Sequence, residues 1–218
     1  MENANSEYQF LNTEIAMKYF ADADIALKQG RHIQNYGVDT QIFYFIDEYF
    51  NKGLKDYYAN FWLMNLVQDS IDNERFYYLD FPENSKGKLG KDNRSKELDG
   101  EKMIFAILLL NLYNEKFFEE KEFSWQDLEQ IFKENENKLL WRKLLYKRQK
   151  ENYTADEEKT VREKVERILD DFEKLGWLVM QDKEEMQFKI LPSIARIGRL
   201  YADVINNIET IEKFLDNE

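Results

Sequence analysis

The stretch from Thr154 to Pro192 constrains the fold most, because a complete helix signal is followed there by a complete hairpin signal. Thr154 and Glu157 have the spacing of a capping box, in which a hydroxyl and a carboxylate bond the backbone N–H groups that a helix start leaves free. Gly176 can adopt the left-handed conformation that often ends a helix. Between them the apolar residues recur at helical spacing. They are Val161, Val165, Ile168, Leu169, Phe172 and Leu175.

The residues after Gly176 predict a β-hairpin. Side chains alternate in character over residues 177–181 and 186–190, on both sides of a polar turn at residues 182–185. A period of two is that of a strand, and Pro192 ends the second run because proline has no N–H for the ladder. A long helix that leads into such a hairpin is typical of the second half of a winged-helix domain.

The first part of the chain predicts three helices and one strand. We expect helices at residues 12–30, 39–53 and 54–66, with Asn12 and Asp39 as N-caps and glycines at positions 30 and 53 as stops. Residues 75–81 alternate like a strand and end before Pro82. This set of elements suits a small winged-helix domain.

The second part of the chain adds further helix signals. Asp99 is expected to cap a helix whose run from Met103 to Leu110 is apolar nearly all round and should be buried on most sides. Residues 124–127 form a second capping-box pattern. We therefore predict a mainly α fold with short β-hairpins, built from tandem winged-helix domains. The predicted parts are an N-terminal winged-helix domain at 1–85, a basic linker loop at 86–98, and a C-terminal winged-helix domain with a heptad helix at 99–218.

Charge restricts how the chain could bind nucleic acid. It has 31 basic and 43 acidic residues, a net charge of −12, so only local basic patches could contact DNA. One patch is the predicted linker, and the other is an amphipathic helix over Lys138 to Lys150, which contains six basic residues and no acid. An ordinary solvated helix face is the alternative reading of the second patch. The candidate DNA-backbone contacts are Lys86, Lys88, Lys91, Arg94, Lys96, Lys138, Arg142, Lys143, Lys147 and Lys150.

The C-terminal residues predict a last helix from Ser193 with an apolar seam at heptad spacing. Such a seam either packs on its own chain or is shared with another subunit. The candidate partner-helix seam consists of Ile197, Tyr201, Val204, Ile208, Ile211 and Leu215.

Reactive side chains are scarce. The chain has no cysteine and one histidine, His32, so thiolate zinc sites and multi-histidine centres are excluded. No nucleotide-binding or hydrolase motif occurs, and Asp22 and Asp24 point to different sides of their helix. We expect no catalytic residue, cofactor or metal, although carboxylates alone leave a magnesium nuclease as a weak option. No signal sequence or spanning run is evident, so we expect a soluble, cytoplasmic protein.

Several stretches together resemble one family, the MksE/MukE-type subunits of bacterial condensins. They are Gly30-Arg31-His32-Ile33, Tyr57-Tyr58 followed by Phe76-Tyr77-Tyr78-Leu79, and the run from Phe188 to Arg196. The resemblance implies a non-enzymatic, nucleoid-associated homodimer that binds a kleisin (MksF-like) and an SMC-like ATPase (MksB-like). It also implies sequence-independent DNA contact, in chromosome condensation and segregation or in defence against plasmids. The sequence leaves the choice between these two roles open.

A dimeric winged-helix transcription regulator is the alternative. It needs a recognition helix with base-reading side chains. The helix from Val161 to Leu175 interleaves Arg162, Lys164 and Arg167 with acids, whose carboxylates repel phosphates. Sequence preference therefore separates the two hypotheses.

Overall fold

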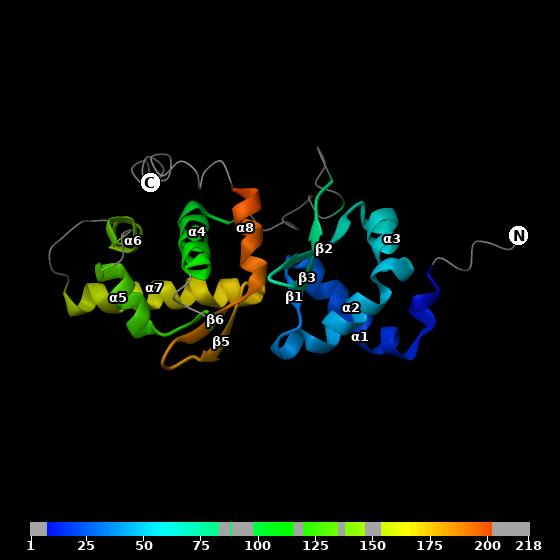
Figure 1. Ribbon diagram of the computed structural model, residues 1–218, viewed down its shortest axis with the longest axis horizontal. Helices are drawn as coiled ribbons and strands as arrows, with labels where there is room; N and C mark the ends of the chain where they lie inside the picture. Colours follow the sequence, from blue (N-terminus) through cyan, green and yellow to red (C-terminus); the bar gives the residue numbers. More distant parts are fainter. Residues whose placement is uncertain are drawn as a thin grey trace, which may run out of the picture. The chain divides into compact units, whose positions relative to one another are not determined.

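The computed structural model describes residues 8–82, 88, 98–115, 120–134, 138–146 and 154–201. The chain divides into two compact units, unit 1 with residues 1–97 and unit 2 with residues 98–218. Each unit combines helices with one small antiparallel sheet of three strands (Figure 1). This confirms the mainly α class with short hairpins. The winged-helix type and the domain limits remain predictions.

Unit 1 contains short helices and three strands, several of them joined without a loop. In chain order they are η1 (Gln9–Asn12), α1 (Glu14–Lys28), β1 (Ile33–Gln34), η2 (Gly37–Asp39), α2 (Thr40–Tyr49), η3 (Phe50–Leu54), α3 (Lys55–Tyr57), η4 (Tyr58–Trp62), β2 (Asn65–Ile71) and β3 (Glu74–Asp80). The segments η3 and η4 are π-helical, and the chain kinks inside η3, where Gly53 has a φ of 105°.

The sheet of unit 1 has the order β1-β3-β2. Strands β2 and β3 form a hairpin in which Leu66 pairs with Leu79. Asp72 and Asn73 connect them, both with positive φ (50° and 66°), as a two-residue type I′ turn requires. Tyr77 and Leu79 join the helical core, which confirms the strand predicted at residues 75–81.

The third predicted helix of unit 1, residues 54–66, was wrong at its end. The helical segment stops at Trp62, because Leu63 adopts a left-handed conformation with φ 52° and ψ 43°. Leu66, which matches the helical spacing of Tyr58 and Trp62, instead lies in β2 and is buried in the core. The spacing of apolar residues could not distinguish these alternatives, since a short apolar run fits either period.

Two helix starts also differ from expectation. Thr13, not Asn12, is the N-cap of α1, and its hydroxyl accepts the N–H of Ala16 at 3.2 Å. Asp39 precedes α2 but makes no capping bond. Its carboxylate instead accepts two hydrogen bonds from Nε of Arg31, at 3.0 and 2.8 Å. The half-buried Arg31 guanidinium thus takes the place of the local backbone as the partner of this buried carboxylate.

Unit 2 has longer helices. Its elements are α4 (Gly100–Asn114), β4 (Glu122–Phe123), α5 (Trp125–Glu134), α6 (Lys138–Tyr146), α7 (Ala155–Lys174), β5 (Leu178–Asp182), β6 (Gln187–Ile190), η5 (Pro192–Ile194) and α8 (Ala195–Leu200). Helix α4 packs between α6 and α8, with α7 running below them in the view of Figure 1. Residues 104–110 of α4 are all buried, which confirms the prediction for this run.

The helix and hairpin predicted at Thr154 to Pro192 are confirmed. Thr154 and Glu157 form a complete capping box at the start of α7, and Gly176 follows the helix with a φ of 72°. Strands β5 and β6 pair antiparallel, and β4 completes the sheet in the order β4-β6-β5. The second capping box is also present, since Ser124 N–H donates to Asp127 at 2.7 Å and Asp127 N–H to the Ser124 hydroxyl at 3.3 Å.

No helix in the described part of the chain is both long enough and apolar enough to span a membrane.

Candidate interaction surfaces

The predicted basic loop is described only in part. Lys88 has an exposed side chain, and its backbone N–H donates to the carbonyl of Trp62 at 3.0 Å. The other four candidates of this stretch lie outside the described residues. They are Lys86, Lys91, Arg94 and Lys96.

Helix α6 contains the described part of the second basic stretch. Trp141, Leu144 and Leu145 are buried, while Lys138 is exposed. Trp141 anchors the helix, because its ring lies 5.2 Å from that of Phe105 and 5.1 Å from that of Phe132. Arg142 and Lys143 are half-buried. The amphipathic pattern is therefore present over residues 138–146, whereas Lys147 and Lys150 lie outside the described residues.

Three basic residues in the middle of α7 are engaged within unit 2. Arg162 donates to the carbonyl of Glu184 in the β5–β6 turn at 2.8 Å, with its guanidinium 5.7 Å from the ring centre of Trp125. Lys164 donates to Glu101 at 2.8 Å and to the carbonyl of Leu144 at 3.0 Å. Nε of Arg167 donates to the carbonyl of Glu163 at 3.0 Å. These contacts hold the cations against their own unit.

The turn of the β5–β6 hairpin is fixed and acidic. The Asp182 carboxylate accepts the N–H groups of Glu184 and Glu185 at 2.8 and 3.0 Å. Lys183 is paired with Asp170 at 3.3 Å. The carboxylates of this turn face solvent, so they would repel a phosphate backbone.

An ion-pair network joins α4 to α7. Lys102 contacts Asp171 at 3.0 Å and Asp99 at 3.3 Å, and Lys174 contacts Asp171 at 3.0 Å. The hydrogen bond from Lys174 lowers the pKa of Asp171. Burial opposes this shift, and the hydrogen bond from Lys102 adds to it. Exposed pairs of this kind contribute little to stability because water screens them.

The predicted C-terminal seam begins inside the core. Ile197 is fully buried in α8, and a Cβ at Gly198 would lie 3.3 Å from Leu110 of α4, so the two helices approach closely. Helix α8 ends at Leu200, and the half-buried Tyr201 follows it as the last described residue. The remaining seam candidates, Val204, Ile208, Ile211 and Leu215, lie outside the described residues.

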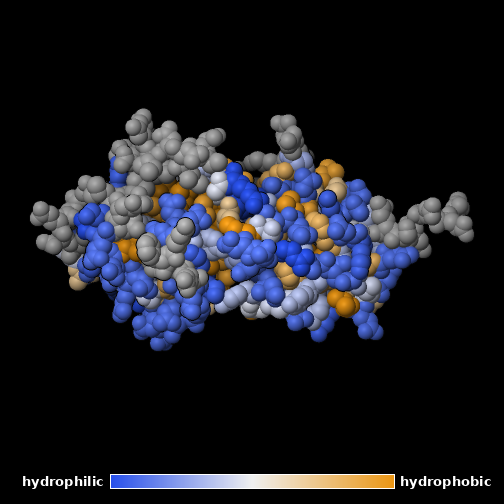
Figure 2. Space-filling view, in the orientation of Figure 1, coloured by the Kyte–Doolittle hydropathy of each residue, from blue (hydrophilic) through white to orange (hydrophobic). Residues whose placement is uncertain are grey.

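Exposed apolar side chains gather in unit 1. Of the described large hydrophobic residues that are well exposed, only Leu200 belongs to unit 2. Those of unit 1 are Ile15, Met17, Ile25, Val38, Tyr44, Phe61, Leu63 and Phe81. Figure 2 shows hydrophobic patches separated by hydrophilic surface on the face that it draws. Exposed apolar patches rimmed by polar residues mark protein contact sites.

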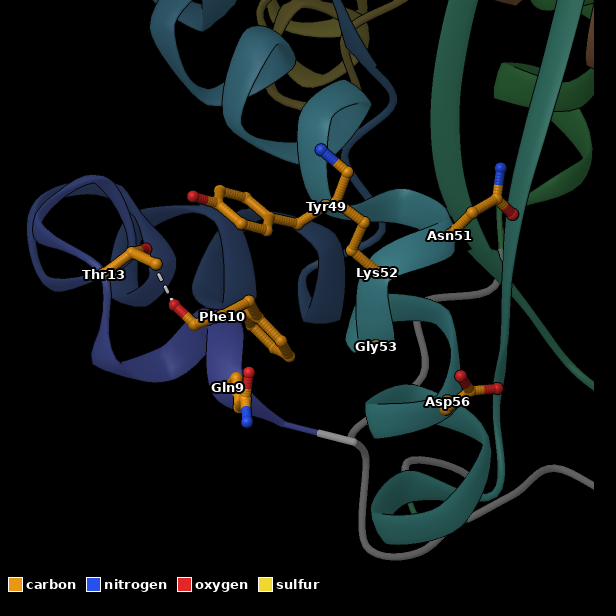
Figure 3. Close-up of a pocket in the computed structure, with 8 residues that line it drawn as sticks. All are labelled: Gln9, Phe10, Thr13, Tyr49, Asn51, Lys52, Gly53 and Asp56. Atoms are coloured by element: carbon orange, nitrogen blue, oxygen red, sulfur yellow. Dashed lines mark hydrogen bonds between the residues drawn. The ribbon is translucent and has the colours of Figure 1, made fainter. Parts of the chain in front are cut away.

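A pocket of about 540 Å³ lies in unit 1, where the chain kinks after α2 (Figure 3). Thr13 on one wall donates its hydroxyl to the carbonyl of Phe10 at 2.8 Å. On the other wall, Lys52 is paired with Glu48. This pocket was not predicted from the sequence, in which Gly53 was the one signal for the kink beside it. The lining residues are Gln9, Phe10, Thr13, Tyr49, Asn51, Lys52, Gly53 and Asp56.

Histidine and carboxylates were the remaining candidates for chemistry. His32 is buried, with its ring 5.1 Å from that of Tyr78 and 6.4 Å from that of Phe76. Asp24 pairs with Lys28 one turn further along α1. Among the residues that the structure describes, no three potential metal ligands gather at one point.

Two polar contacts tie the core of unit 1 together. The Arg31–Asp39 pair is mostly buried, and burial raises the pKa of Asp39 although the guanidinium opposes this. The Asp47 carboxylate accepts a hydrogen bond from the Tyr77 hydroxyl and forms an ion pair with Arg75 at 2.6 Å. Both contacts hold elements in place and were not predicted from the sequence.

The sequence matches the model of one known protein family. The model for the condensin complex protein MksE matches residues 18–202, which include most of both units. No curated protein was found to match the chain. The matched span is far more than half of the 218 residues. The chain therefore belongs to the MksE family of condensin complex proteins.

Proposed function

We propose that this protein is a non-catalytic accessory subunit of a bacterial SMC-like condensin complex of the MksBEF/MukBEF type. The family match over residues 18–202 carries the proposal. The subunit would bind a kleisin (MksF-like) and work with an SMC-like ATPase (MksB-like) in chromosome condensation and segregation or in plasmid defence. A cytoplasmic, nucleoid-associated homodimer is part of the proposal.

Both units are proposed to be winged-helix domains. The supporting observation is that they share one order of elements: a helix, a short strand, further helices and then a hairpin. They also share one strand order, in which the short strand pairs with the second strand of the hairpin. Unit 2 additionally has α6 before α7, and η5 and α8 after its hairpin. The repeated topology suits a protein that presents surfaces to other macromolecules.

Purification of the tagged full chain from its source cells tests the assignment. We expect mass spectrometry to identify a kleisin and a coiled-coil ATPase among the co-purifying proteins. Reproducible recovery of the chain without either subunit would contradict the proposal. Reading frames beside the gene would distinguish the two roles, since an adjacent toprim-like nuclease frame indicates defence.

DNA contact is proposed to be sequence-independent and to use the backbone. The basic residues of α6 support it, because Lys138, Arg142 and Lys143 lie on a helix without acids whose Trp141, Leu144 and Leu145 are buried. Phosphate contacts position a protein but carry no sequence information. Binding should therefore be nearly equal for unrelated duplexes competing at physiological salt.

The structure offers less support for a transcription regulator. Helix α7 precedes the hairpin, as a recognition helix would, but Arg162, Lys164 and Arg167 all bond within unit 2. A strong preference for one operator in the competition experiment would favour the regulator. Magnesium-dependent nicking of plasmid by the purified chain would reveal a nuclease instead.

A further inference from the structure

The outer face of α1 carries apolar side chains that unit 1 does not bury. On the inner face Ala16, Ala23 and Leu27 are buried and fix the helix in the core. On the outer face Ile15 is 48% exposed and Ile25 is 55% exposed. Isoleucine gains little burial at such positions, and its helix propensity is lower than that of alanine or lysine. The two isoleucines therefore indicate a contact outside unit 1.

Two charged residues complete a stripe with these isoleucines. Lys18 and Asp22 lie between them, and the four residues follow one another at the three-four-three spacing of a single helix face. Both charged side chains are exposed. The ammonium group of Lys18 lies 5.0 Å from the ring centre of Tyr19, and within the described part of the chain neither Lys18 nor Asp22 forms an ion pair. The stripe thus has no net charge and leaves one cation and one anion available to a partner.

The stripe is complementary to a reversed copy of itself. Ile15 and Ile25 are equally far from residue 20 along the chain, and so are Lys18 and Asp22. In a two-fold symmetric pair, residue i contacts residue j of the second copy while j contacts i. An axis beside residue 20 therefore places isoleucine against isoleucine and lysine against aspartate when two α1 helices lie antiparallel. Ala21 is exposed beside that axis, and its small side chain permits a close approach of the two helices.

Charge favours a second copy over other partners. The net charge of −12 makes two copies repel each other, so association is favoured only at a face without excess acid. The neutral stripe of α1 meets that condition. A nucleic acid requires an excess of cations, which the stripe does not have. A different protein would impose no reversed order on these four residues, whereas self-complementarity is a property of two-fold interfaces.

We propose that α1 packs antiparallel against α1 of a second copy of this chain, about a two-fold axis beside residue 20. The inference rests on the homodimer of the proposed function and specifies its interface. Ile15 and Ile25 supply the apolar contacts. The two Lys18–Asp22 pairs fix the register, because opposite charges across an interface suppress the alignments that bring like charges together.

The test reverses one charge at a time in the full chain. Lys18→Glu brings two carboxylates together across the axis, and Asp22→Lys brings two ammonium groups together. Symmetry repeats each like-charge contact, so we expect either variant to weaken the dimer about a hundredfold, or about tenfold for each contact. Sedimentation over a range of concentrations measures this. Lys55→Glu is the matched control, because Lys55 is exposed in the same unit outside the stripe, and it should leave the dimer unchanged.

An equimolar mixture of Lys18→Glu and Asp22→Lys provides the decisive measurement. Each contact in the mixed dimer joins opposite charges again, so the mixture should associate as tightly as the wild type. A folding defect cannot produce this recovery, since each chain would carry its defect into the mixture.

The possible failures are distinguishable. If the wild type is a dimer and the two variants dimerise equally well alone, or if their mixture stays monomeric, the α1 interface is wrong and the homodimer stands. A monomeric wild type would overturn the homodimer of the proposed function and the α1 interface with it. Membership of a condensin complex is decided separately, by the co-purifying subunits.

Discussion

Two fully buried tyrosines of unit 1 differ in the hydrogen bonding of their hydroxyl groups. Tyr77 donates to Asp47, which also pairs with Arg75. Within the described part of the chain, the Tyr58 hydroxyl and the Oδ1 of Asp24 are buried without a well-formed hydrogen bond, although the Asp24 carboxylate interacts with the phenol closely enough to raise its pKa. A buried hydroxyl without a partner loses its hydration without compensation. The same residue type should therefore stabilise the fold at one position and not at the other.

Replacement of each tyrosine by phenylalanine tests this difference. Tyr77→Phe removes a charge-assisted hydrogen bond and should lower the free energy of unfolding by about 1–3 kcal/mol. Tyr58→Phe removes an unsatisfied hydroxyl and should change it by less than about 0.5 kcal/mol, or raise it. Urea unfolding of both variants measures the two values. Equal losses would show that the Tyr58 hydroxyl has a partner in solution.

The same tyrosines predict the response to alkali. Burial, and then the nearby Asp24 or Asp47 carboxylate, raises the pKa of Tyr58 and Tyr77 above the ordinary value of 10.0. The folded state therefore favours the neutral phenols. Their contribution to stability is complete below about pH 10 and declines as the pH rises toward the folded-state pKa values. Absorbance at 295 nm should show two phenols that ionise only when the chain unfolds, and their early ionisation in folded protein would contradict this.

At the scale of elements, helix starts that are fixed by local hydrogen bonds could be predicted from the sequence. Strands that exist only through long-range pairing could not. Thr154, Ser124 and Asp99 were recognisable as caps because their partners lie three residues away. Strands β1 and β4 have two residues each and exist only through pairing with β3 and β6. A two-residue strand shows no period in the sequence. Distant partners define such elements.

Strand β2 was missed for a related reason. Its apolar pattern is interrupted by Gln68, Asp69 and Ser70. The N–H of Ser70 donates a hydrogen bond to the Asp69 carboxylate at 2.7 Å. In β5, Met180 N–H is likewise bonded by Glu173 at 2.9 Å. Carboxylates at open strand edges oppose pairing with another chain. The polar residues that obscured β2 thus fit its position at the edge of a sheet.

The capping box of α7 gives an element-scale prediction. Thr154→Ala removes the bond to Glu157 N–H and should lower the free energy of unfolding by about 1 kcal/mol. Thr160→Ala is the matched control, because the Thr160 hydroxyl only bonds the carbonyl of Asp156 inside the helix. Alanine has the better helix propensity there, so the control should be neutral or slightly stabilising. Guanidinium unfolding of both variants provides the comparison, and equal effects would exclude a specific role of the cap.

For the whole molecule, composition alone indicated the broad class of function. The charge of −12 and the scarcity of reactive residues favoured a binding protein, and the family match agrees with a condensin subunit. The exposed apolar side chains of unit 1 could not be recognised beforehand. Their surface position depends on helix ends such as Leu63, which the apolar spacing hid.

The salt dependence of DNA binding tests the basic face of α6. Each phosphate contact contributes about −0.9 to the slope of log K against log salt concentration. Replacement of Lys138, Arg142 and Lys143 by glutamine should flatten the slope by about 2.7 and weaken binding. Replacement of the exposed Lys52, Lys55 and Lys159 by glutamine is the charge-matched control. Fluorescence anisotropy measures both, and equal slopes for the two triple variants would contradict a role for α6.

The position of Trp62, which stacks on Lys28, has a practical consequence for spectroscopy. Trp62 is the one tryptophan among residues 1–97, whereas Trp125, Trp141 and Trp177 all belong to residues 98–218. The indole emission of a Trp62→Phe protein would therefore come from the second half of the chain alone. Subtracting it from the parent spectrum during denaturation would isolate the signal of the first half, so the melting of each half could be followed without an added dye.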